Sequence, residues 1–255
     1  MATTNTNFPS MRVDGLVAVV TGAGRGIGRG AALALAEAGA RVIAISRTAS
    51  QTQSLVEEIT ANGGEASAMV CDLTDSDAMR ETLSNIERMD ILVNNAGVNA
   101  PGPFLEMDHA QLDLILNLNV RAACLVAQEG ARRMANQGSG VIINLSSTFG
   151  KVGRPGNAVY SASKHFIEGL TKSLAVELAP NHIRVVAVGP TAIVTPMTAE
   201  RLADPVSGND LLSRIPLGRF GQVEDVVGAI VFLASPAAAL ITGVTLMVDG
   251  GWTAQ

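Results

Sequence analysis

Short apolar runs alternate with longer segments of helical pattern along this 255-residue chain. The runs are Leu16–Thr21, Val42–Ser46, Ala66–Cys71, Ile91–Asn94, Val141–Leu145, Ile183–Val188 and Val244–Val248. Most are continuously apolar, which is typical of strands buried on both faces of a parallel sheet. The predicted helices between them are Ile27–Ala38, Ser50–Ala61, Asp75–Ile86, His109–Asn136, Val159–Leu178 and Val223–Leu233. This alternation predicts a doubly wound α/β fold, with a parallel seven-stranded sheet flanked by helices.

Length and composition suit a single domain. Hydrophobic residues make up 47% of the chain, aromatic residues 3%, and the net charge is −5. Such a chain can bury one sizeable core. It lacks the basic stretches and stacking aromatics that nucleic-acid binding requires. We predict a disordered tail at residues 1–10 and one domain at residues 11–255.

Residues 191–218 interrupt the regular alternation of strands and helices. They include Pro196, Pro205 and Pro216 before the next clean helix. Irregular segments near strand ends are often functional. We interpret this one as a mobile flap with a little helix in it, and an irregular surface excursion is the alternative.

The sequence carries no targeting or metal-binding pattern. The first ten residues lack the basic and apolar regions of a secretory signal, and no apolar stretch reaches the ~18 residues of a membrane span. Cys71 and Cys124 lie in apolar runs without metal spacing, and the histidines form no ligand pattern. We expect a soluble cytoplasmic protein with reduced thiols, no metal, and neither nucleic acid nor a membrane as partner.

A glycine-rich turn follows the first apolar run. Gly22, Gly26 and Gly28 form a G-x-x-x-G-x-G pattern between a predicted strand and a predicted helix. Without Cβ atoms, such a turn lets the main chain approach a pyrophosphate at a helix N-terminus. In this context it predicts a Rossmann-type dinucleotide-binding fold. A phosphate-loop NTPase is disfavoured, because no Gly-Lys-Ser/Thr follows the glycines.

The end of the second run favours NADP(H) as the cofactor. NAD-binding sheets usually carry a ribose-binding acid there, whereas this chain has Ser46 and Arg47. Arg25, in the glycine turn, could converge on the same place. Two guanidiniums and a hydroxyl suit a 2′-phosphate. NAD(H) remains possible, and the alternative for the arginines is a solvated surface role.

Tyr160 and Lys164 lie four residues apart on a predicted helix, so that both point the same way. A phenol ionises near a pKa of ~10, and a cation beside it favours the phenolate and lowers that value. Ser147 lies at the end of an apolar run and could hold a substrate oxygen. The three residues predict a proton-transfer site that works with a redox cofactor.

Together these features resemble the short-chain dehydrogenase/reductases, in their compact single-domain branch. The resemblance extends from Gly15 to Trp252. It rests on the ordered motifs Thr21–Gly28, Asp72-Leu73, Asn94-Asn95-Ala96-Gly97, Asn119, Ser147, Tyr160-x-x-x-Lys164 and Gly189–Met197.

The resemblance implies four catalytic residues. Tyr160 is the general acid in reduction and the base in oxidation. Lys164 binds the nicotinamide ribose and, together with the charge of the oxidised ring, lowers the pKa of Tyr160. Ser147 hydrogen-bonds to the carbonyl oxygen. Asn119 holds a water that relays protons from Lys164 to solvent, and its alternative is a buried residue that kinks its helix.

The resemblance also implies a set of cofactor contacts. In it, Asp72 and Leu73 contact the adenine, and Ile193 and Thr195 hold the carboxamide and phosphates. The whole expected set is Gly22, Arg25, Gly26, Ile27, Gly28, Ser46, Arg47, Asp72, Leu73, Asn95, Ala96, Gly97, Tyr160, Lys164, Pro190, Ile193 and Thr195.

Two positions depart from the family pattern. Val186 replaces the usual Asn, and Gly189-Pro190-Thr191 replaces the usual Pro-Gly, so that Thr191 adds a Cβ beside the nicotinamide. The main-chain path there can therefore differ from the family's, but no proton-transfer group is lost.

The loops expected to face the substrate are Val98–Phe104 and Thr148–Arg154, together with the flap. They are mainly small and apolar. Arg154 could pair with an anionic substrate such as a carboxylate. We favour an exposed loop arginine, because charge is rarely buried without a partner, and Lys151 has the same two interpretations.

We predict an NADP(H)-dependent oxidoreductase that interconverts a ketone and a secondary alcohol by hydride transfer, with Tyr160 as acid and base. The expected substrate is a small molecule, either a 3-oxoacyl thioester or a sugar-like polyol. Alternatives are an NAD-dependent dehydrogenase of the same family, an epimerase or dehydratase of the longer sister branch, and a noncatalytic nucleotide sensor. Short length argues against the sister branch, and the complete Asn–Ser–Tyr–Lys set argues against a sensor.

We also expect a homo-oligomer, a tetramer by resemblance to the family. On the helix from Val159, Ile167 and Thr171 could face the sheet and leave Phe166 and Leu170 for a partner helix. The apolar end of the chain, Gly243–Trp252, could form a second contact.

Overall fold

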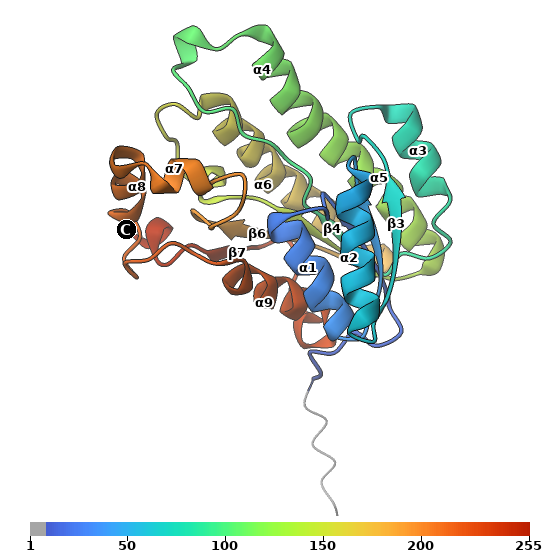
Figure 1. Cartoon of the computed structure of the whole chain (residues 1–255). Coiled ribbons are helices and arrows are strands. Elements are labelled where there is room, and N and C mark those ends of the chain that lie inside the picture. The colour runs from blue at the N-terminus through green and yellow to red at the C-terminus, as the bar shows by residue number, and fades with distance from the viewer. Residues whose placement is uncertain (1–8) are drawn as a thin grey trace, which may run out of the picture.

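One parallel sheet of seven strands forms the centre of the molecule in the computed structural model, which describes residues 9–255. The strands are β1 (Val17–Thr21), β2 (Arg41–Ser46), β3 (Glu65–Val70), β4 (Ile91–Asn94), β5 (Gly140–Leu145), β6 (Ile183–Pro190) and β7 (Thr245–Val248). Their order is β3-β2-β1-β4-β5-β6-β7 (Figure 1). The doubly wound α/β fold predicted from the alternating pattern is confirmed.

Helices cover both faces of this sheet (Figure 1). They are α1 (Gly26–Glu37), α2 (Ala49–Ala61), α3 (Ser76–Ser84), α4 (His109–Ile115), α5 (Ala123–Gln137), α6 (Ala158–Leu178), α7 (Ala199–Ala203), α8 (Pro205–Leu212) and α9 (Val223–Ala234). Leu35 of α1 and Ile230 of α9 belong to the core of one face, and Met79 of α3 and Val126 of α5 to that of the other. Burial of these apolar side chains drives the two layers together.

The inner strands are apolar along their length because both of their faces are covered. Every residue of β1 and of β4 is buried. The edge strand β3 is different, since most of its side chains are exposed or half-buried, and Val70 is 56% exposed. The continuous apolar pattern therefore indicates full burial only for strands inside the sheet.

The strand order reverses beside β1, which pairs with β2 on one side and β4 on the other. All strands are parallel, so the turns after β1, β2, β4, β5 and β6 meet at one edge of the sheet. A crevice opens at such a reversal outside the carboxyl ends of the strands, and ligands bind there in folds of this kind.

The predicted helix 109–136 is one continuous helix, but it is not α-helical throughout. Residues Leu116–Ala122, between α4 and α5, form π-helical turns. The helix from His109 to Gln137 is long and apolar enough to cross a membrane, which corrects the expectation that no segment reaches that length. A helix packed on the core of a water-soluble protein passes the same test.

The predicted flap, residues 191–218, contains α7 and α8 and is joined to the rest of the chain by a β-bridge between Ile193 and Gly221. Leu211 and Ile215 pack with Phe149 and Trp252 in a small separate core. The helical content expected of the flap is present, and its movement stays a prediction. Of the predicted N-terminal tail, residues 1–8 lie outside the described residues.

Candidate active site

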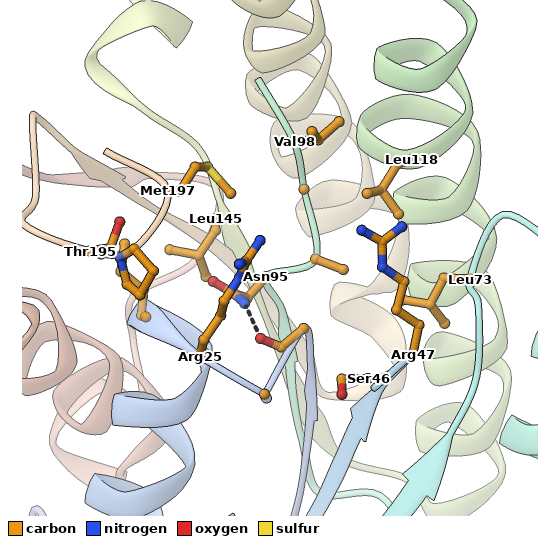
Figure 2. A pocket seen from close by; sticks show the side chains of 18 of the residues that line it. Arg25, Ser46, Arg47, Leu73, Asn95, Val98, Leu118, Leu145, Thr195 and Met197 are labelled. Atoms are coloured by element: carbon orange, nitrogen blue, oxygen red, sulfur yellow. Dashed lines mark hydrogen bonds between the residues drawn. The ribbon is translucent and has the colours of Figure 1, made fainter. Parts of the chain in front are cut away.

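A cavity of about 500 Å³ lies where the strand order reverses. Its wall includes the glycine-rich turn, the ends of β2, β4 and β5, and the start of the flap (Figure 2). All of the cofactor contacts expected from the sequence lie in this wall, and so do Ser147, Tyr160 and Lys164. The fourth expected catalytic residue, Asn119, lies behind the wall, as described below.

Tyr160 and Lys164 lie one turn apart on α6, as their spacing predicts. The Lys164 ammonium lies 5.6 Å from the centre of the Tyr160 ring and donates a hydrogen bond of 2.7 Å to the main-chain oxygen of Leu145. Lys164 is 6% exposed. The last residue of β5 therefore fixes the ammonium beside the phenol, inside the cavity.

Burial determines the acidity of this pair. It raises the pKa of Tyr160 to about 12, against a hydrogen bond with Ser147 that lowers it. It also lowers the pKa of Lys164 to about 8, because a charged ammonium loses hydration there. The direction for Tyr160 is opposite to the one predicted from the Tyr–Lys spacing. In the protein chain alone, loss of hydration has the larger effect on the phenol.

Ser147 follows β5 directly and caps a short 3-10 turn, Thr148–Gly150. Its Oγ accepts a hydrogen bond of 3.2 Å from the Phe149 main-chain N–H and also bonds to the Tyr160 side chain. Two hydroxyl groups from different elements therefore meet in the cavity. Such a pair can hold one substrate oxygen and exchange a proton with it.

Asn119 lies within the π-helical turns and is 2% exposed. Its Oδ1 accepts a hydrogen bond from the main-chain N–H of Val98, and its Nδ2 donates to the Val98 oxygen, both at 2.8 Å. Nδ2 also donates to Ser163 Oγ. The amide thus ties the loop after β4 to two helices. The water relay inferred from the family resemblance stays a prediction.

Two glycines of the turn, Gly22 and Gly28, are packed so closely that a Cβ does not fit there. A Cβ at Gly28 would lie 2.3 Å from the Gly22 oxygen and 2.4 Å from Asn95 Nδ2. Gly22 and Gly26 have φ of 65° and 58°, a left-handed conformation that favours glycine. The turn therefore presents bare main chain at the start of α1, as an anionic pyrophosphate requires.

The two predicted arginines extend into the same cavity from neighbouring turns. Arg25 precedes α1, Arg47 follows β2, and both side chains point into the open space in Figure 2. Ser46, the last residue of β2, is buried and bonds to the main chain of Thr48. No acidic residue directly follows β2. Hydrogen bonds from Thr74 lower the pKa of the Asp72 carboxylate, after the neighbouring strand β3, and the nearby charge of Arg47 lowers it further.

Several wall residues were missed by sequence reasoning. They are Thr48, Gln51, Cys71, Thr74, Leu114 and Leu118. Gln51 lies close to Gly24, since a Cβ at Gly24 would come 2.5 Å from its Oε1. Its place in the first turn of a helix that follows a cofactor-binding strand is the signal that could have identified it.

Three further polar side chains, those of Asn94, Ser146 and Asp249, form hydrogen bonds within the fold. Asn94 joins β4 to β5 through Asn144, at 3.1 Å. Ser146 lies in the cavity wall, and its hydroxyl donates to the buried carboxylate of Glu168. Asp249 accepts hydrogen bonds from the main-chain N–H groups of Gly251 and Thr253, as a turn residue does.

One interpretation was wrong. Arg154 is not an exposed loop arginine, because its side chain is only 10% exposed and pairs with Asp210 of α8. Lys151 is also paired, with the buried carboxylate of Glu168. The local sequence shows neither partner, since Asp210 lies 56 residues away.

A family model described as enoyl-(acyl carrier protein) reductase matches residues 22–253 of this chain. The match covers the glycine-rich turn, the Ser–Tyr–Lys set and the end of the sheet. The chain is a short-chain dehydrogenase/reductase. It belongs to the family that the order of its motifs indicated, and with this the predicted enzyme class, an oxidoreductase of alcohol and carbonyl groups, is confirmed.

Curated and solved members of the family match this short-chain dehydrogenase/reductase over nearly their whole length. L-xylulose reductase of Bos taurus is 43% identical over 96% of this chain and 99% of its own. A provisionally assigned NAD(P)-dependent gluconate 5-dehydrogenase of Beutenbergia cavernae, with NADP bound at low occupancy, is 40% identical, covers 96% of this chain and 99% of its own, and has a TM-score of 0.92.

A third relative carries both a cofactor and a small acid. It is a gluconate 5-dehydrogenase from Burkholderia cenocepacia, solved in complex with NADP and tartrate. It is 34% identical, covers 96% of this chain and 98% of its own, and has a TM-score of 0.93. The dinucleotide cofactor expected from the glycine-rich turn is thus seen in proteins of the same fold.

Proposed function

We propose that this protein is an NADP(H)-dependent oxidoreductase that interconverts a ketone and a secondary alcohol, with Tyr160 as the proton donor and acceptor. The observation that carries the proposal is the convergence of Ser147, Tyr160 and Lys164 in one wall of a cavity whose opposite end is the glycine-rich turn. Hydride chemistry needs proton transfer beside a bound dinucleotide, and these two parts share one space.

The residues of the cavity fit the cofactor on three grounds. The turn after β1 has no room for a Cβ at Gly28. The tip of β2 offers guanidiniums instead of an acid, which suits the 2′-phosphate of NADP. Thr191, in the cavity wall, has a buried hydroxyl without a hydrogen-bond partner among the described residues. That hydroxyl could serve a polar group of the bound cofactor.

When bound, the nicotinamide supplies or accepts the hydride and, when oxidised, adds a positive charge to the site. Ser147 and Tyr160 hold the substrate oxygen through their hydroxyls. With its pKa raised by burial to about 12, Tyr160 keeps its proton at neutral pH. It is therefore prepared to protonate the oxygen of a carbonyl that is being reduced. Oxidation requires the opposite transfer, which a nearby positive charge promotes.

Lys164 serves the same step from one turn away on α6. Its pKa of about 8 leaves it mainly protonated at neutral pH. The Lys164 ammonium uses one N–H donor for the Leu145 main-chain oxygen, which fixes its position. Its other two donors are available for the hydroxyls of a ribose. Asn119 positions the Val98 loop that closes this side of the cavity.

For the substrate we propose a small sugar-like ketone or polyol. The relatives reported above are named for L-xylulose and gluconate, and one holds tartrate. A 3-oxoacyl thioester is the second candidate, favoured by a 40% identical relative from Thermotoga maritima that is named 3-oxoacyl-[acyl-carrier-protein] reductase. We further propose that the enzyme is soluble and cytoplasmic and works as a homo-oligomer.

The test is reduction of a panel of ketoses, sugar acids and 3-oxoacyl thioesters, followed by the absorbance of NADPH. We expect turnover with at least one ketone. Tyr160→Phe is expected to lower kcat at least 1,000-fold and to leave the Kd of NADPH within about 2-fold, because only the proton-donating hydroxyl group is removed. Tight NADPH binding without turnover of any compound would instead favour a noncatalytic sensor.

A further inference from the structure

Arg154 lies in the loop between β5 and α6, the same loop that joins Ser147 to Tyr160. Its side chain is 10% exposed, and its Nη2 donates a hydrogen bond of 2.7 Å to Asp210 on α8 of the flap. The other two nitrogens, Nε and Nη1, are buried and have no acceptor among residues 9–255. A buried guanidinium thus uses only one of its three nitrogens.

Such an arrangement is unusual for a structural residue. More than nine in ten buried polar groups in proteins have a hydrogen-bond partner, and leaving a charged donor unpaired costs more than leaving a neutral one. Buried arginines normally meet carboxylates or phosphates through two donors at once. The free donors of Arg154 therefore indicate a missing acceptor.

The surroundings favour an anionic acceptor. Burial lowers the pKa of Arg201, and charge repulsion from the nearby Arg154 lowers it further, whereas Asp210 raises it. Among residues 9–255, Asp210 is the only acid paired with Arg154, and it also pairs with the exposed Arg214, at 3.3 Å. Three guanidiniums therefore surround one carboxylate that is itself 44% exposed. This cluster has excess positive charge in a partly dehydrated place, where an anion is stabilised.

Arg154 also lies close to the proton-transfer site. Its guanidinium carbon is 5.8 Å from the centre of the Phe149 ring, and that ring meets the Tyr160 ring edge to face at 6.2 Å. One aromatic ring therefore separates the cation from the catalytic phenol. Arg154 lies beside the cavity rather than in its wall, under α8. The flap carries Asp210, the partner of Arg154.

We propose that Arg154 binds the carboxylate of the substrate, so that the enzyme acts on sugar-type hydroxy and oxo acids in preference to neutral ketoses. The carboxylate accepts hydrogen bonds from the free donors, while Nη2 keeps Asp210 and with it the flap. One guanidinium then joins the substrate to the segment that closes over it. The inference rests on the proposed function and defines its substrate class.

The experiment compares 5-keto-D-gluconate with its uncharged methyl ester as substrates, with NADPH in excess. We expect the wild-type enzyme to prefer the acid at least 10-fold in kcat/KM. Arg154→Gln should raise KM for the acid 10- to 100-fold, which is the effect of losing about 1.5–3 kcal/mol of charge-assisted hydrogen bonding. It should change kcat/KM for the ester less than 3-fold.

Arg132→Gln is the control, because Arg132 on α5 pairs with Glu129 outside this cluster and its side chain is 62% exposed. This variant should have kcat/KM values for both substrates within 2-fold of those of the wild type. Asp210→Asn tests whether Arg154 acts only by holding the flap. If Arg154→Gln and Asp210→Asn lower the activity toward acid and ester equally, the role is structural and the proposal fails. The Kd of NADPH and the melting temperature identify a variant that does not fold, and Arg154→Lys then takes its place.

Two further outcomes would overturn the proposal. One is a wild-type enzyme that reduces the ester or L-xylulose as well as the acid. The other is a preference confined to D-fructose 6-phosphate, which would make a phosphate the ligand of Arg154. Either result leaves the oxidoreductase function intact. Absence of turnover with every ketone, in contrast, contradicts the proposed function itself.

Discussion

Tyr160 and Lys164 are the ionisable side chains of the cavity whose pKa values the fold shifts most. Both shifts come mainly from burial, and both favour the neutral form of the side chain. The phenol therefore stays protonated and the ammonium is destabilised. At the scale of single residues, the fold prepares a proton donor beside a cation that is costly to bury.

The burial of Lys164 predicts a pH-dependent stability. Between pH 8 and about 10.5 the unfolded chain holds the Lys164 proton and the folded protein does not, so unfolding takes up a proton and stability rises with pH. Tyr160, with its raised pKa, acts in the opposite direction above pH 10. Between pH 8 and pH 10, the deprotonation of Lys164 in the folded protein should raise the free energy of unfolding by about 2 kcal/mol.

Urea unfolding of wild type and Lys164→Met, without cofactor, measures this contribution. The wild type should gain about 2 kcal/mol relative to the variant between pH 8 and 10. All other titrating groups cancel in the difference. A constant difference across this range would show that the ammonium is not destabilised in the folded protein.

Cofactor choice is also decided by single residues. Arg47→Gln should lower kcat/KM for NADPH about 10- to 100-fold, because it removes a charge-assisted bond to the 2′-phosphate. With NADH, which has no such phosphate, the change should be less than 2-fold. Arg41→Gln, at the start of the same strand, is the control. Equal losses with both cofactors would contradict the assignment.

At the scale of elements, the contact between β1, α1 and the loop after β4 shapes the cofactor end of the cavity. Asn95 Nδ2 donates to the Thr21 oxygen at 2.9 Å, and Thr21 Oγ1 accepts from the main-chain N–H of Asn95 at 3.0 Å. These bonds hold two turns in register across the strand reversal. Gly28 lies against both of them and leaves no space.

Gly28→Ala should therefore displace the turn. We expect the Kd of NADPH to rise at least 10-fold and the free energy of unfolding to fall by about 1–3 kcal/mol, as overpacking does. Gly228→Ala, on α9, is the control, since a Cβ there has no atom within 4 Å. It should leave NADPH binding unchanged. Isothermal titration measures the Kd of NADPH for both variants. Equal Kd values would contradict the prediction, because they would show that the turn accommodates the added methyl group without losing NADPH binding.

At the scale of the whole molecule, apolar side chains remain exposed on several elements. In the most apolar stretch of the long helix His109–Gln137, only 33% of the residues are buried. The loop before it exposes Phe104 by 66% and Leu105 by 97%. On α6, Ile167 and Thr171 are buried as predicted, and Phe166 stays 36% exposed. Apolar patches of this kind often mark contacts between subunits.

We predict a homo-oligomer, with a tetramer as the family-based expectation. Light scattering at micromolar concentration should give a mass that is a multiple of the 26.3 kDa chain. Phe166→Glu should lower that mass, because it places a charge at a partner contact. Leu240→Glu is the control, since this 98% exposed side chain lies in a different segment. A mass of 26.3 kDa for the wild type would contradict the prediction.

The sequence alone determined the order of strands and helices, the glycine-rich turn and the Ser–Tyr–Lys set. These follow from local patterns: continuous apolar runs, absent Cβ atoms and a four-residue helical spacing. The sequence could not predict that the side chains of β3 are exposed, because their exposure depends on the position of that strand at the edge of the sheet. Nor could it give the π-helical turns around Asn119, which no residue pattern marks.

Only the tertiary structure decided the acidity of Tyr160 and the surroundings of Arg154. Burial by the packed chain removes water from the phenol and raises its pKa. This effect is larger than the lowering of the pKa that we predicted from the neighbouring Lys164. Arg154 is buried because α8 brings Asp210 to it from 56 residues away. Periodicity and motif spacing report local geometry, whereas burial and ion pairing depend on contacts between segments far apart in the chain.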